Sequence, residues 1–278
     1  MIIVKIKGGL GNQLFQYAFA RYLSLKTGHE LIFDLSYFKE QSFRKFDLDK
    51  FNIAQYKKLG FIDFLYLKLA KRFPIYFNKL NIINEPDGQK DPEKFLNILP
   101  SCYLDGYWQS ETYFKEIQTV IKKEFTLKDQ LEGDNKNILD KIKNTNSVAI
   151  HVRRDDFVSV PQNAPYNVCD LNYYKKALEI INSKVSNSVF FVFSDDSSWC
   201  KENIKTGSQT FFIDSNQDRP YIDLFLYSQC KHAIMANSTF SWWATWLNDN
   251  SDKVIVAPYY YRKNAVLEGF VTDFQIRI

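Results

Sequence analysis

The sequence has few of the residues that build disulfide scaffolds or metal centres. Its four cysteines, Cys102, Cys169, Cys200 and Cys230, are scattered, and no two of them form a close pair. This spacing excludes a disulfide scaffold and a cysteine-based zinc site, and it suits a reducing compartment. Only three histidines are present, so a centre built from several histidines is not expected.

Long apolar runs are also missing. No uninterrupted stretch of about 18 apolar residues occurs, so we expect no membrane-spanning helix. Met1 leads directly into an apolar run over residues 2–6, which is too short and wrongly flanked for a signal peptide. We therefore expect a cytoplasmic protein.

The net charge of +4 is too small to indicate a nucleic-acid partner. Positive charge is concentrated between Lys57 and Leu80, in a stretch that is also rich in Phe, Leu and Tyr. A basic aromatic stretch can lie on an anionic membrane, which would make the contact of the protein with the membrane peripheral. Because the apolar residues here lack a regular period, the favoured interpretation is an ordinary pair of helices with solvated lysines.

What the chain does have is enough apolar sequence for a large core. It is 45% hydrophobic and 24% charged over 278 residues, which suits one large or two modest domains. From residue 147 onward, short apolar runs alternate with helical patterns, as in a parallel sheet covered by helices. The predicted strands are 148–152, 189–193, 210–213, 233–236 and 254–258, with helices over 171–181 and from Pro220.

The first half is less regular. We expect strands over 2–7 and 30–34, a helix from Leu14, and helices over about 111–125 and 136–143. The polar stretch 129–137 is a plausible boundary region, and we divide the chain into domains 1–145 and 146–278.

The residues with the strongest chemical signal follow the predicted strand 148–152. This strand contains His151, and Arg153, Arg154, Asp155 and Asp156 come at its carboxyl end. In open α/β sheets, ligands bind beyond the carboxyl ends of the strands. Two adjacent guanidinium groups present planar forks that match phosphate oxygens, so the sequence predicts a diphosphate clamp. A cluster of surface ion pairs is the alternative.

Polar residues follow other strands as well. Asp195 and Asp196 come after 189–193, and Asn237, Ser238 and Thr239 come after 233–236. The hydroxyl residues can cap the next helix, whose free N–H groups would attract an anion. Because parallel strands end at one edge, this repetition favours a site over a chance surface cluster.

A glycine-rich turn follows the first strand. Gly9 and Gly11 are spaced as in a dinucleotide fingerprint, but Leu14 stands where that fingerprint has Gly or Ala. Asn12 and Gln13 add hydrogen-bonding side chains at the mouth of the helix. A simple connecting turn and a dinucleotide-dependent oxidoreductase both remain as alternatives, and the paired arginines speak against the oxidoreductase.

Another cluster could bind sugars. Tyr107 and Trp108 offer faces for stacking, and Asp105, Gln109 and Glu111 offer polar groups for hydroxyls. A strand that leads into a capped helix explains the same residues. A non-catalytic module that binds carbohydrate or nucleic acid is the corresponding functional alternative.

Taken together, four motifs resemble the α-1,2-fucosyltransferases that use GDP-fucose, which form glycosyltransferase family 11. The wider resemblance is to the α-1,6- and protein O-fucosyltransferases. The motifs occur in family order and span nearly the whole chain: GGLGNQ at 8–13, HVRRDD at 151–156, FSDD at 193–196 and HAIMANSTFSWW at 232–243.

The resemblance implies a GT-B fold, with two Rossmann-like domains facing a central cleft. Residues 1–145 would form the acceptor-side domain and 146–278 the GDP-fucose domain. The implied reaction is inverting transfer of L-fucose from GDP-β-L-fucose to the 2-hydroxyl of a terminal galactose or similar sugar, without a metal or other cofactor. The expected setting is bacterial O-antigen or capsule synthesis, with an oligosaccharide acceptor that can be lipid-linked. A fucosyltransferase of different linkage and a glycan-binding module are alternatives.

The resemblance also implies roles for single residues. Arg153 would grip the donor pyrophosphate with Arg154 in support, while His151 and Asp223 would read guanine. Asp195 and Asp196 would lie by the nucleotide or hold the arginines. The remaining expected substrate-binding residues are Gly11, Asn12, Gln13, Asn237, Ser238, Thr239 and Phe240.

One departure from the family pattern is Asp155, which replaces the usual glycine before Asp156. Its carboxylate could weaken the field at the pyrophosphate or pair with Arg154. Asp156, Asp105 and Glu111 are the candidates for the base that deprotonates the acceptor hydroxyl.

Overall fold

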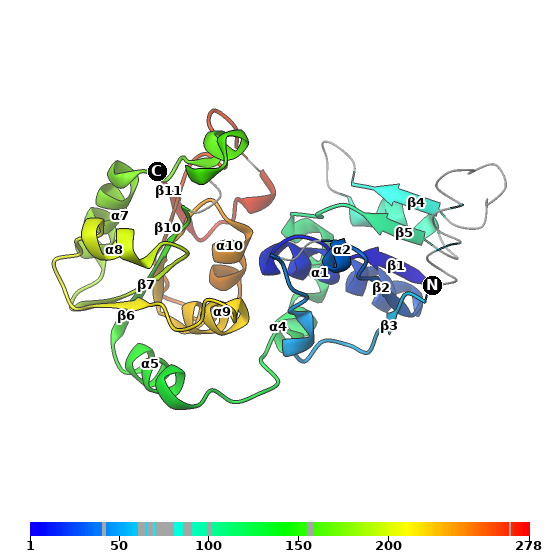
Figure 1. Cartoon of the computed structure of the whole chain (residues 1–278), viewed down its shortest axis with the longest axis horizontal. Helices are drawn as coiled ribbons and strands as arrows, with labels where there is room; N and C mark the ends of the chain where they lie inside the picture. The colour runs from blue at the N-terminus through cyan, green and yellow to red at the C-terminus, as the bar shows by residue number, and fades with distance from the viewer. Residues whose placement is uncertain are drawn as a thin grey trace. The chain divides into compact units, whose positions relative to one another are not determined.

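The structure is a computed structural model that describes residues 1–40, 43–60, 65, 69, 81–85, 91–98, 102–154, 158–266 and 268–278. The chain forms two compact units, Met1–Lys128 and Asp129–Ile278, and each is built around one parallel sheet (Figure 1). Helix α5 (Gly133–Lys143) lies between this boundary and the one placed after residue 145, and it packs on α9 of the second unit.

In the first unit the strand order is β3-β2-β1-β5-β4, with every pair parallel. The order reverses between β1 and β5, because the chain moves outward to β3 and then returns to the other side of β1. The strands are β1 (Ile2–Lys5), β2 (Leu31–Asp34), β3 (Lys57–Lys58), β4 (Asn81–Asn84) and β5 (Cys102–Asp105). The described helices are α1 (Leu10–Thr27), α2 (Tyr37–Glu40) and α4 (Gln118–Glu124), with 3₁₀ turns η1 (Leu48–Lys50), η3 (Pro92–Ile98), η4 (Glu111–Tyr113) and η5 (Lys115–Ile117).

Helix α1 is the central helix of this unit. It is apolar on nearly every side, as expected for a helix within a core rather than on a surface. Its Phe19 packs against Trp108 and Tyr113, with ring centroids 4.5 and 4.7 Å apart. Gly28 ends the helix in a left-handed conformation with φ of 70°.

The single helix expected over 111–125 is wrong in detail. The segment forms η4, η5 and then α4, because Phe114 and Ile117 interrupt the helical backbone at φ of −142° and −109°. Ser110 caps the first of these turns by accepting a hydrogen bond from the Thr112 N–H.

In the second unit the strand order is β11-β10-β9-β6-β7-β8, again with all pairs parallel. This is the doubly wound order of a Rossmann fold, with the reversal between β6 and β9. The strands are β6 (Asn146–Val152), β7 (Ser188–Ser194), β8 (Thr210–Ile213), β9 (His232–Ile234), β10 (Ile255–Ala257) and β11 (Gln275–Arg277). The other helices are α7 (Leu171–Lys184), α8 (Ser197–Asn203), α9 (Pro220–Gln229) and α10 (Thr239–Trp246), with η6 (Pro161–Tyr166) and η7 (Glu268–Phe270).

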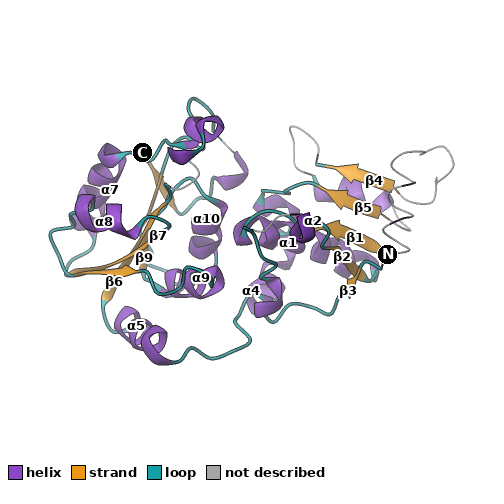
Figure 2. Cartoon of the chain, viewed as in Figure 1, coloured by secondary structure: helices purple, strands orange, loops and turns teal. Residues whose placement is uncertain are grey.

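The core of the second unit forms between β6, β7 and the helices beside them. Val148, Ile150 and Val152 of β6 pack with Ala177 and Ile181 of α7. Figure 2 shows the strands of this unit with helices around them, which confirms the predicted α/β class. Near-continuous burial along β6 explains its unbroken apolar run in the sequence.

Among the described residues, no helix combines the length and the apolarity needed to cross a membrane. Of the basic aromatic stretch, the structure describes 57–60, 65 and 69. The predicted helical pair and the peripheral membrane contact lie largely outside the described residues.

The glycine turn before α1 is held by side chains of α1 itself. Gln13 Nε2 donates to the carbonyls of Gly8 at 3.1 Å and Lys45 at 2.8 Å, and Gln13 Oε1 accepts from the Asp47 N–H at 3.0 Å. Asn12 Oδ1 accepts from Gln109 Nε2 at 2.9 Å and so ties the turn to the segment after β5. Gly8 has φ of 80°, and a Cβ there would lie 2.7 Å from Asn12 Nδ2.

We expect Gly8→Ala to destabilise the first unit more than Gly28→Ala does. Both glycines have left-handed backbones, with φ of 80° and 70°, so both variants lose about 1–2 kcal/mol of unfolding free energy. Only Gly8→Ala also displaces Asn12, which adds about 1 kcal/mol because the bond to Gln109 is lost, whereas a Cβ at Gly28 meets no atom within 4 Å. Urea unfolding followed by circular dichroism measures both, and equal losses would contradict the role given to Asn12.

Candidate active site

The candidate site of the second unit lies where its strand order reverses. Ligands of doubly wound sheets bind at the carboxyl ends of the two strands on either side of such a reversal. Here those strands are β6, which is followed by Arg153 and Arg154, and β9, which is followed by the loop into α10. The predicted cluster therefore falls at the position where this fold binds ligands.

Arg153 and Arg154 are held by the two aspartates that follow β7. Arg153 Nη1 lies 3.2 Å from Asp195 Oδ2, and Arg154 Nε lies 3.1 Å from Asp196 Oδ2. Asp195 Oδ1 also accepts a hydrogen bond from the Arg154 N–H at 2.9 Å. The two aspartates thus fix the direction of both guanidinium groups, and both arginine side chains stay partly exposed.

Trp199 is a contact that the sequence analysis missed. The Arg154 guanidinium lies over its ring, 4.0 Å from the centroid. Asp196 caps α8 by accepting from the Trp199 N–H at 3.0 Å. Arg154 is therefore packed between an aromatic face and a carboxylate, which is a more supported position than a surface arginine has. The signal in the sequence that could have indicated this contact is a tryptophan in the first turn of the helix that follows FSDD.

His151 is buried beside two aromatic rings. Its ring centroid lies 5.1 Å from that of Phe240 and 6.3 Å from that of Tyr227, and the residue is 7% exposed. Burial, reinforced by the charge of Arg153, lowers its pKa to about 3, so the imidazole is neutral near pH 7. Nδ1 has no hydrogen-bond partner among the described residues. A buried polar atom of this kind is suited to meet a ligand.

Asp223 lies on α9, one turn before Tyr227. Its Oδ1 accepts a hydrogen bond of 2.8 Å from Asn216 Nδ2. Asn216 also exchanges two hydrogen bonds with Asn135 of α5, at 3.0 and 2.8 Å. Burial raises the pKa of Asp223 to about 7, against the opposing effects of Asn216 and Arg219, so this carboxyl titrates near neutral pH.

The loop between β9 and α10 is supported by Asn237. Its amide donates to the carbonyls of Tyr166 at 2.7 Å and Tyr261 at 2.6 Å, and its Oδ1 lies 3.4 Å from Cys169 Sγ. Asn237 is buried and its side-chain amide is used in these hydrogen bonds, so it holds the loop in place and has no donor left over for a ligand.

Ser238 is the N-cap of α10 and accepts from the Phe240 N–H at 3.2 Å. Thr239 begins the helix, and the first turn carries no acidic side chain. The positive end of the helix dipole is therefore not neutralised by a local carboxylate. The sequence predicted this capped helix N-terminus as the place where an anion such as a phosphate would be attracted.

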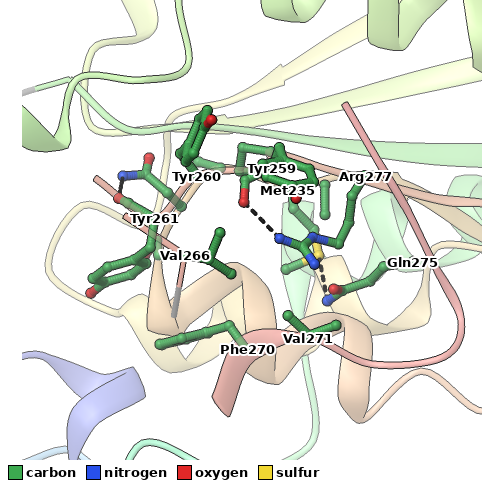
Figure 3. Close-up of a pocket in the computed structure, with 14 residues that line it drawn as sticks. Met235, Tyr259, Tyr260, Tyr261, Val266, Phe270, Val271, Gln275 and Arg277 are labelled. Carbon is green, nitrogen blue, oxygen red and sulfur yellow. Dashed lines mark hydrogen bonds between the residues drawn. The ribbon is translucent and has the colours of Figure 1, made fainter. Parts of the chain in front are cut away.

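A small cavity lies beside this loop (Figure 3). It has a volume of about 30 Å³ and is lined by residues that follow β9 and β10, including Ser238 and Tyr261. Arg277 closes one side by donating from Nη2 to the Tyr259 carbonyl at 2.8 Å. Pockets for whole ligands measure roughly 300–1,000 Å³, so this cavity accepts at most a small group.

The predicted residues of the glycine turn lie in the first unit. Gly11, Asn12 and Gln13 occupy the first turn of α1, and Gln13 is completely buried with its amide engaged as described above. Of the two base candidates there, Asp105 accepts from Lys7 Nζ at 2.7 Å and from Lys5 Nζ at 3.3 Å. Glu111 begins η4.

Asp155 and Asp156 lie outside the described residues, so the structure places neither the base candidate nor the departure from the family pattern. Within the ranges that the structure covers, no group of three His, Cys, Asp or Glu side chains is arranged to hold a metal ion. The expectation of a metal-independent reaction remains a prediction.

The two units, each built on a parallel sheet of Rossmann type, give this protein the GT-B fold. Its fold resembles that of Arabidopsis thaliana FUT1, solved as a mutant in complex with GDP, with a TM-score of 0.56 and 14% identity over 96% of this chain and 72% of that one. It also resembles Escherichia coli ADP-heptose lps heptosyltransferase II, with a TM-score of 0.52 and 12% identity over 100% of this chain and 89% of that one. At these identities the likeness establishes the fold, and the predicted fold class is confirmed.

The chain belongs to glycosyl transferase family 11, whose model matches residues 1–269. It is 32% identical to an Escherichia coli alpha-1,2-colitosyltransferase over 97% of this chain and 95% of that protein. It is 33% identical to the Escherichia coli O-antigen biosynthesis glycosyltransferase WbnK over 91% of this chain and 92% of that protein. Human galactoside alpha-(1,2)-fucosyltransferase 1 is 35% identical over 62% of this chain and 49% of its own length. The predicted family is confirmed.

We expect the stability of the second unit to depend on pH through His151. Its pKa is about 3 when folded and 6.5 when unfolded, so below pH 6.5 the unfolded state takes up the proton first. The free energy of unfolding should therefore fall by about 2 kcal/mol from pH 7 to pH 5 on account of this group. His151→Gln should lack this component.

Urea unfolding at both pH values, followed by tryptophan fluorescence, measures this difference, because four of the five tryptophans lie in the second unit. Asp223 has a raised pKa and so contributes a slope of opposite sign in both proteins, which cancels in the comparison. Identical pH slopes for His151→Gln and the unaltered protein would show that His151 is not held neutral.

Proposed function

We propose that this family 11 glycosyltransferase transfers L-fucose from GDP-β-L-fucose, with inversion, to the 2-hydroxyl of a terminal galactose or similar sugar of a glycan. The observation that carries the proposal is the oriented pair of guanidinium groups at the reversal point of the second sheet, in a chain of this family. The proposed setting is bacterial surface polysaccharide synthesis, which the similarity to WbnK supports. The acceptor would then be an oligosaccharide, with a lipid-linked glycan as one form.

The chemistry assigns Arg153 its role. The acceptor oxygen forms a bond to C1 of fucose while the bond from C1 to the β-phosphate oxygen breaks, and the hydroxyl proton passes to a base. Negative charge then develops on the departing GDP. A fixed cation that is already oriented stabilises this charge without reorganising. Arg153 supplies it, Asp195 aims it, and Arg154 adds the second fork.

The nucleobase would lie beside His151 and Phe240. Guanine offers N–H donors at its N1 and N2 positions, which a carboxylate accepts. Asp223, one turn before the Tyr227 that packs near His151, would supply that carboxylate. Its pKa of about 7 leaves it readily ionised once a ligand donates to it. The neutral imidazole of His151 can contribute one further donor or acceptor.

The phosphates would meet the N-terminus of α10. Ser238 and Thr239 contribute hydroxyl groups there, and the backbone N–H groups face the direction from which an anion is attracted. Asn237 acts indirectly by holding this loop in place. The reaction in this scheme uses no metal and no other cofactor, and Asp156, Asp105 and Glu111 stay the candidates for the base.

A second donor follows from one comparison. The relative with 32% identity over almost the whole chain is an alpha-1,2-colitosyltransferase. Colitose is L-fucose without its 3-hydroxyl, so both donors share the same GDP moiety and 6-methyl group. The nucleotide site described above does not distinguish them, and the choice must depend on contacts to the sugar ring.

The direct test is a transfer assay with GDP-fucose, GDP-colitose, GDP-mannose and UDP-galactose, each with lactose as acceptor. We expect GDP-fucose to give a trisaccharide whose mass increases by one deoxyhexose, with the 2-position of galactose substituted by NMR. UDP-galactose should give no product, because the site is built for guanine. Transfer from GDP-colitose alone would replace fucose by colitose, and product from UDP-galactose alone would overturn the proposal.

Arg153→Ala should lower kcat by about 10²-fold or more, the size of effect seen when one preorganised donor to developing charge is removed. Arg262→Ala is the matched control, since it removes the same charge from an exposed position in the same unit. Steady-state kinetics with saturating acceptor measure both variants. If Arg153→Ala keeps its fold and loses less than tenfold in kcat, Arg153 is not the group that stabilises the leaving nucleotide.

A further inference from the structure

The sheet of the first unit has a reversal point of its own. Its order, β3-β2-β1-β5-β4, places the crevice at the carboxyl ends of β1 and β5. Lys7 and Gly8 follow β1, and the segment Gly106–Gln109 follows β5.

The segment after β5 is held in an unusual conformation. Trp108 has φ of 57°, although it is not a glycine, and its side chain is completely buried against Phe19. Glu85 Oε2 accepts from the N–H groups of both Tyr107 at 2.9 Å and Trp108 at 2.7 Å. Gly106 is required, because a Cβ there would lie 2.6 Å from the Glu85 Cβ. Strained backbone of this kind persists only where its surroundings determine it, and it is concentrated at functional sites.

The effect of this conformation is to present Tyr107. Trp108, which the sequence analysis grouped with Tyr107 as a stacking face, is buried and instead anchors the segment. Tyr107 is 43% exposed on the rigid segment. Its ring lies 4.9 Å from Lys7 Nζ, which also bonds to Asp105 at 2.7 Å.

Lys7 lies beside the ring and belongs to a group of polar side chains on the neighbouring segments. Lys5 and Lys7 both contact the Asp105 carboxylate, and the Asn12–Gln109 amide pair joins the two segments that flank the crevice. Ammonium and amide groups donate hydrogen bonds, whereas carboxylate and amide oxygens accept them. An exposed ring beside donors and acceptors with fixed positions matches a pyranose, which has an apolar C–H face and polar hydroxyls around its edge.

We propose that Tyr107 is the platform on which the acceptor sugar stacks, with Lys7 and Asp105 bonding to its hydroxyls. The ligand class is a neutral hexopyranoside, and under the proposed function it is the terminal galactoside. The inference rests on that function for the identity of the sugar but not for the binding itself. It assigns acceptor recognition to residues of the first unit that no motif of the family resemblance singled out.

The test compares Tyr107→Ala and Tyr107→Phe with Leu25→Ala, which truncates an equally exposed apolar residue of the same unit. Tyr107→Ala should raise the KM for a galactoside acceptor about tenfold, the upper range for one aromatic contact, while the KM for GDP-fucose and the Kd for GDP change less than twofold. Tyr107→Phe keeps the ring and should stay within threefold of the unaltered protein. Leu25→Ala should change neither KM.

An unchanged acceptor KM in Tyr107→Ala would overturn the proposal, as would an equal rise in the KM for the donor. Tyr107→Leu keeps the bulk without the aromatic face, so it decides the question if the alanine variant does not fold. It should show the same rise in acceptor KM.

Direct binding separates this inference from the proposed function. Saturation-transfer NMR with methyl β-D-galactopyranoside and the GDP-loaded protein should give a signal that Tyr107→Ala loses and Leu25→Ala keeps. If the protein transfers no fucose yet shows this pattern, the proposed function fails and the platform stands. Transfer by the unaltered protein, with equal NMR signals in all variants, would leave the function and remove the platform.

Discussion

The paired contacts between the arginines after β6 and the aspartates after β7 are the interaction on which the candidate site depends. They follow from strand register. Val152 of β6 lies opposite Ser194 of β7, so the next two residues of each strand bring Arg153 toward Asp195 and Arg154 toward Asp196. Ion pairs that are partly exposed contribute little stability, about 1 kcal/mol or less. Their effect here is to fix the orientation of the two guanidinium groups, at the edge where doubly wound sheets bind ligands.

The candidate site contains two regions that differ in electrostatics: a buried region with shifted pKa values and a region of paired charges. Around His151 and Asp223, burial lowers the pKa of the imidazole to about 3 and raises that of the carboxyl to about 7, so near pH 7 the imidazole is neutral and the carboxyl is only partly ionised. Around Arg153 and Arg154, each guanidinium group forms an ion pair with an aspartate. A nucleotide has the same division, with a neutral base at one end and a diphosphate at the other. Under the proposed function, the base would lie by the neutral His151 and the diphosphate by the charged Arg153, two residues further along the chain.

Much of the second unit could be predicted from the sequence, because its strands are short apolar runs that end in polar residues. The reversal at β6 and β9 then brings those ends to one edge. Contacts between distant segments could not be predicted in this way. Trp199 packs on Arg154 only through the fold, and Glu85 reaches the Tyr107 and Trp108 backbone across 22 residues or more. Gln13 was predicted to contact a ligand; its amide bonds to Gly8, Lys45 and Asp47, and the last two lie more than thirty residues away, which a local motif does not reveal.

The reciprocal amide pair between Asn135 and Asn216 has a consequence for how the chain can vary. Asn216 uses one amide nitrogen to donate both to Asn135 and to Asp223, so its orientation is locked by a residue more than eighty positions earlier. Replacing Asn135 removes two of the hydrogen bonds that orient the Asn216 amide, and so loosens the donor that favours the ionised Asp223 carboxyl. Residues 135, 216 and 223 therefore form one hydrogen-bonded network, in which a substitution on α5 is expected to change the pKa of the Asp223 carboxyl on α9.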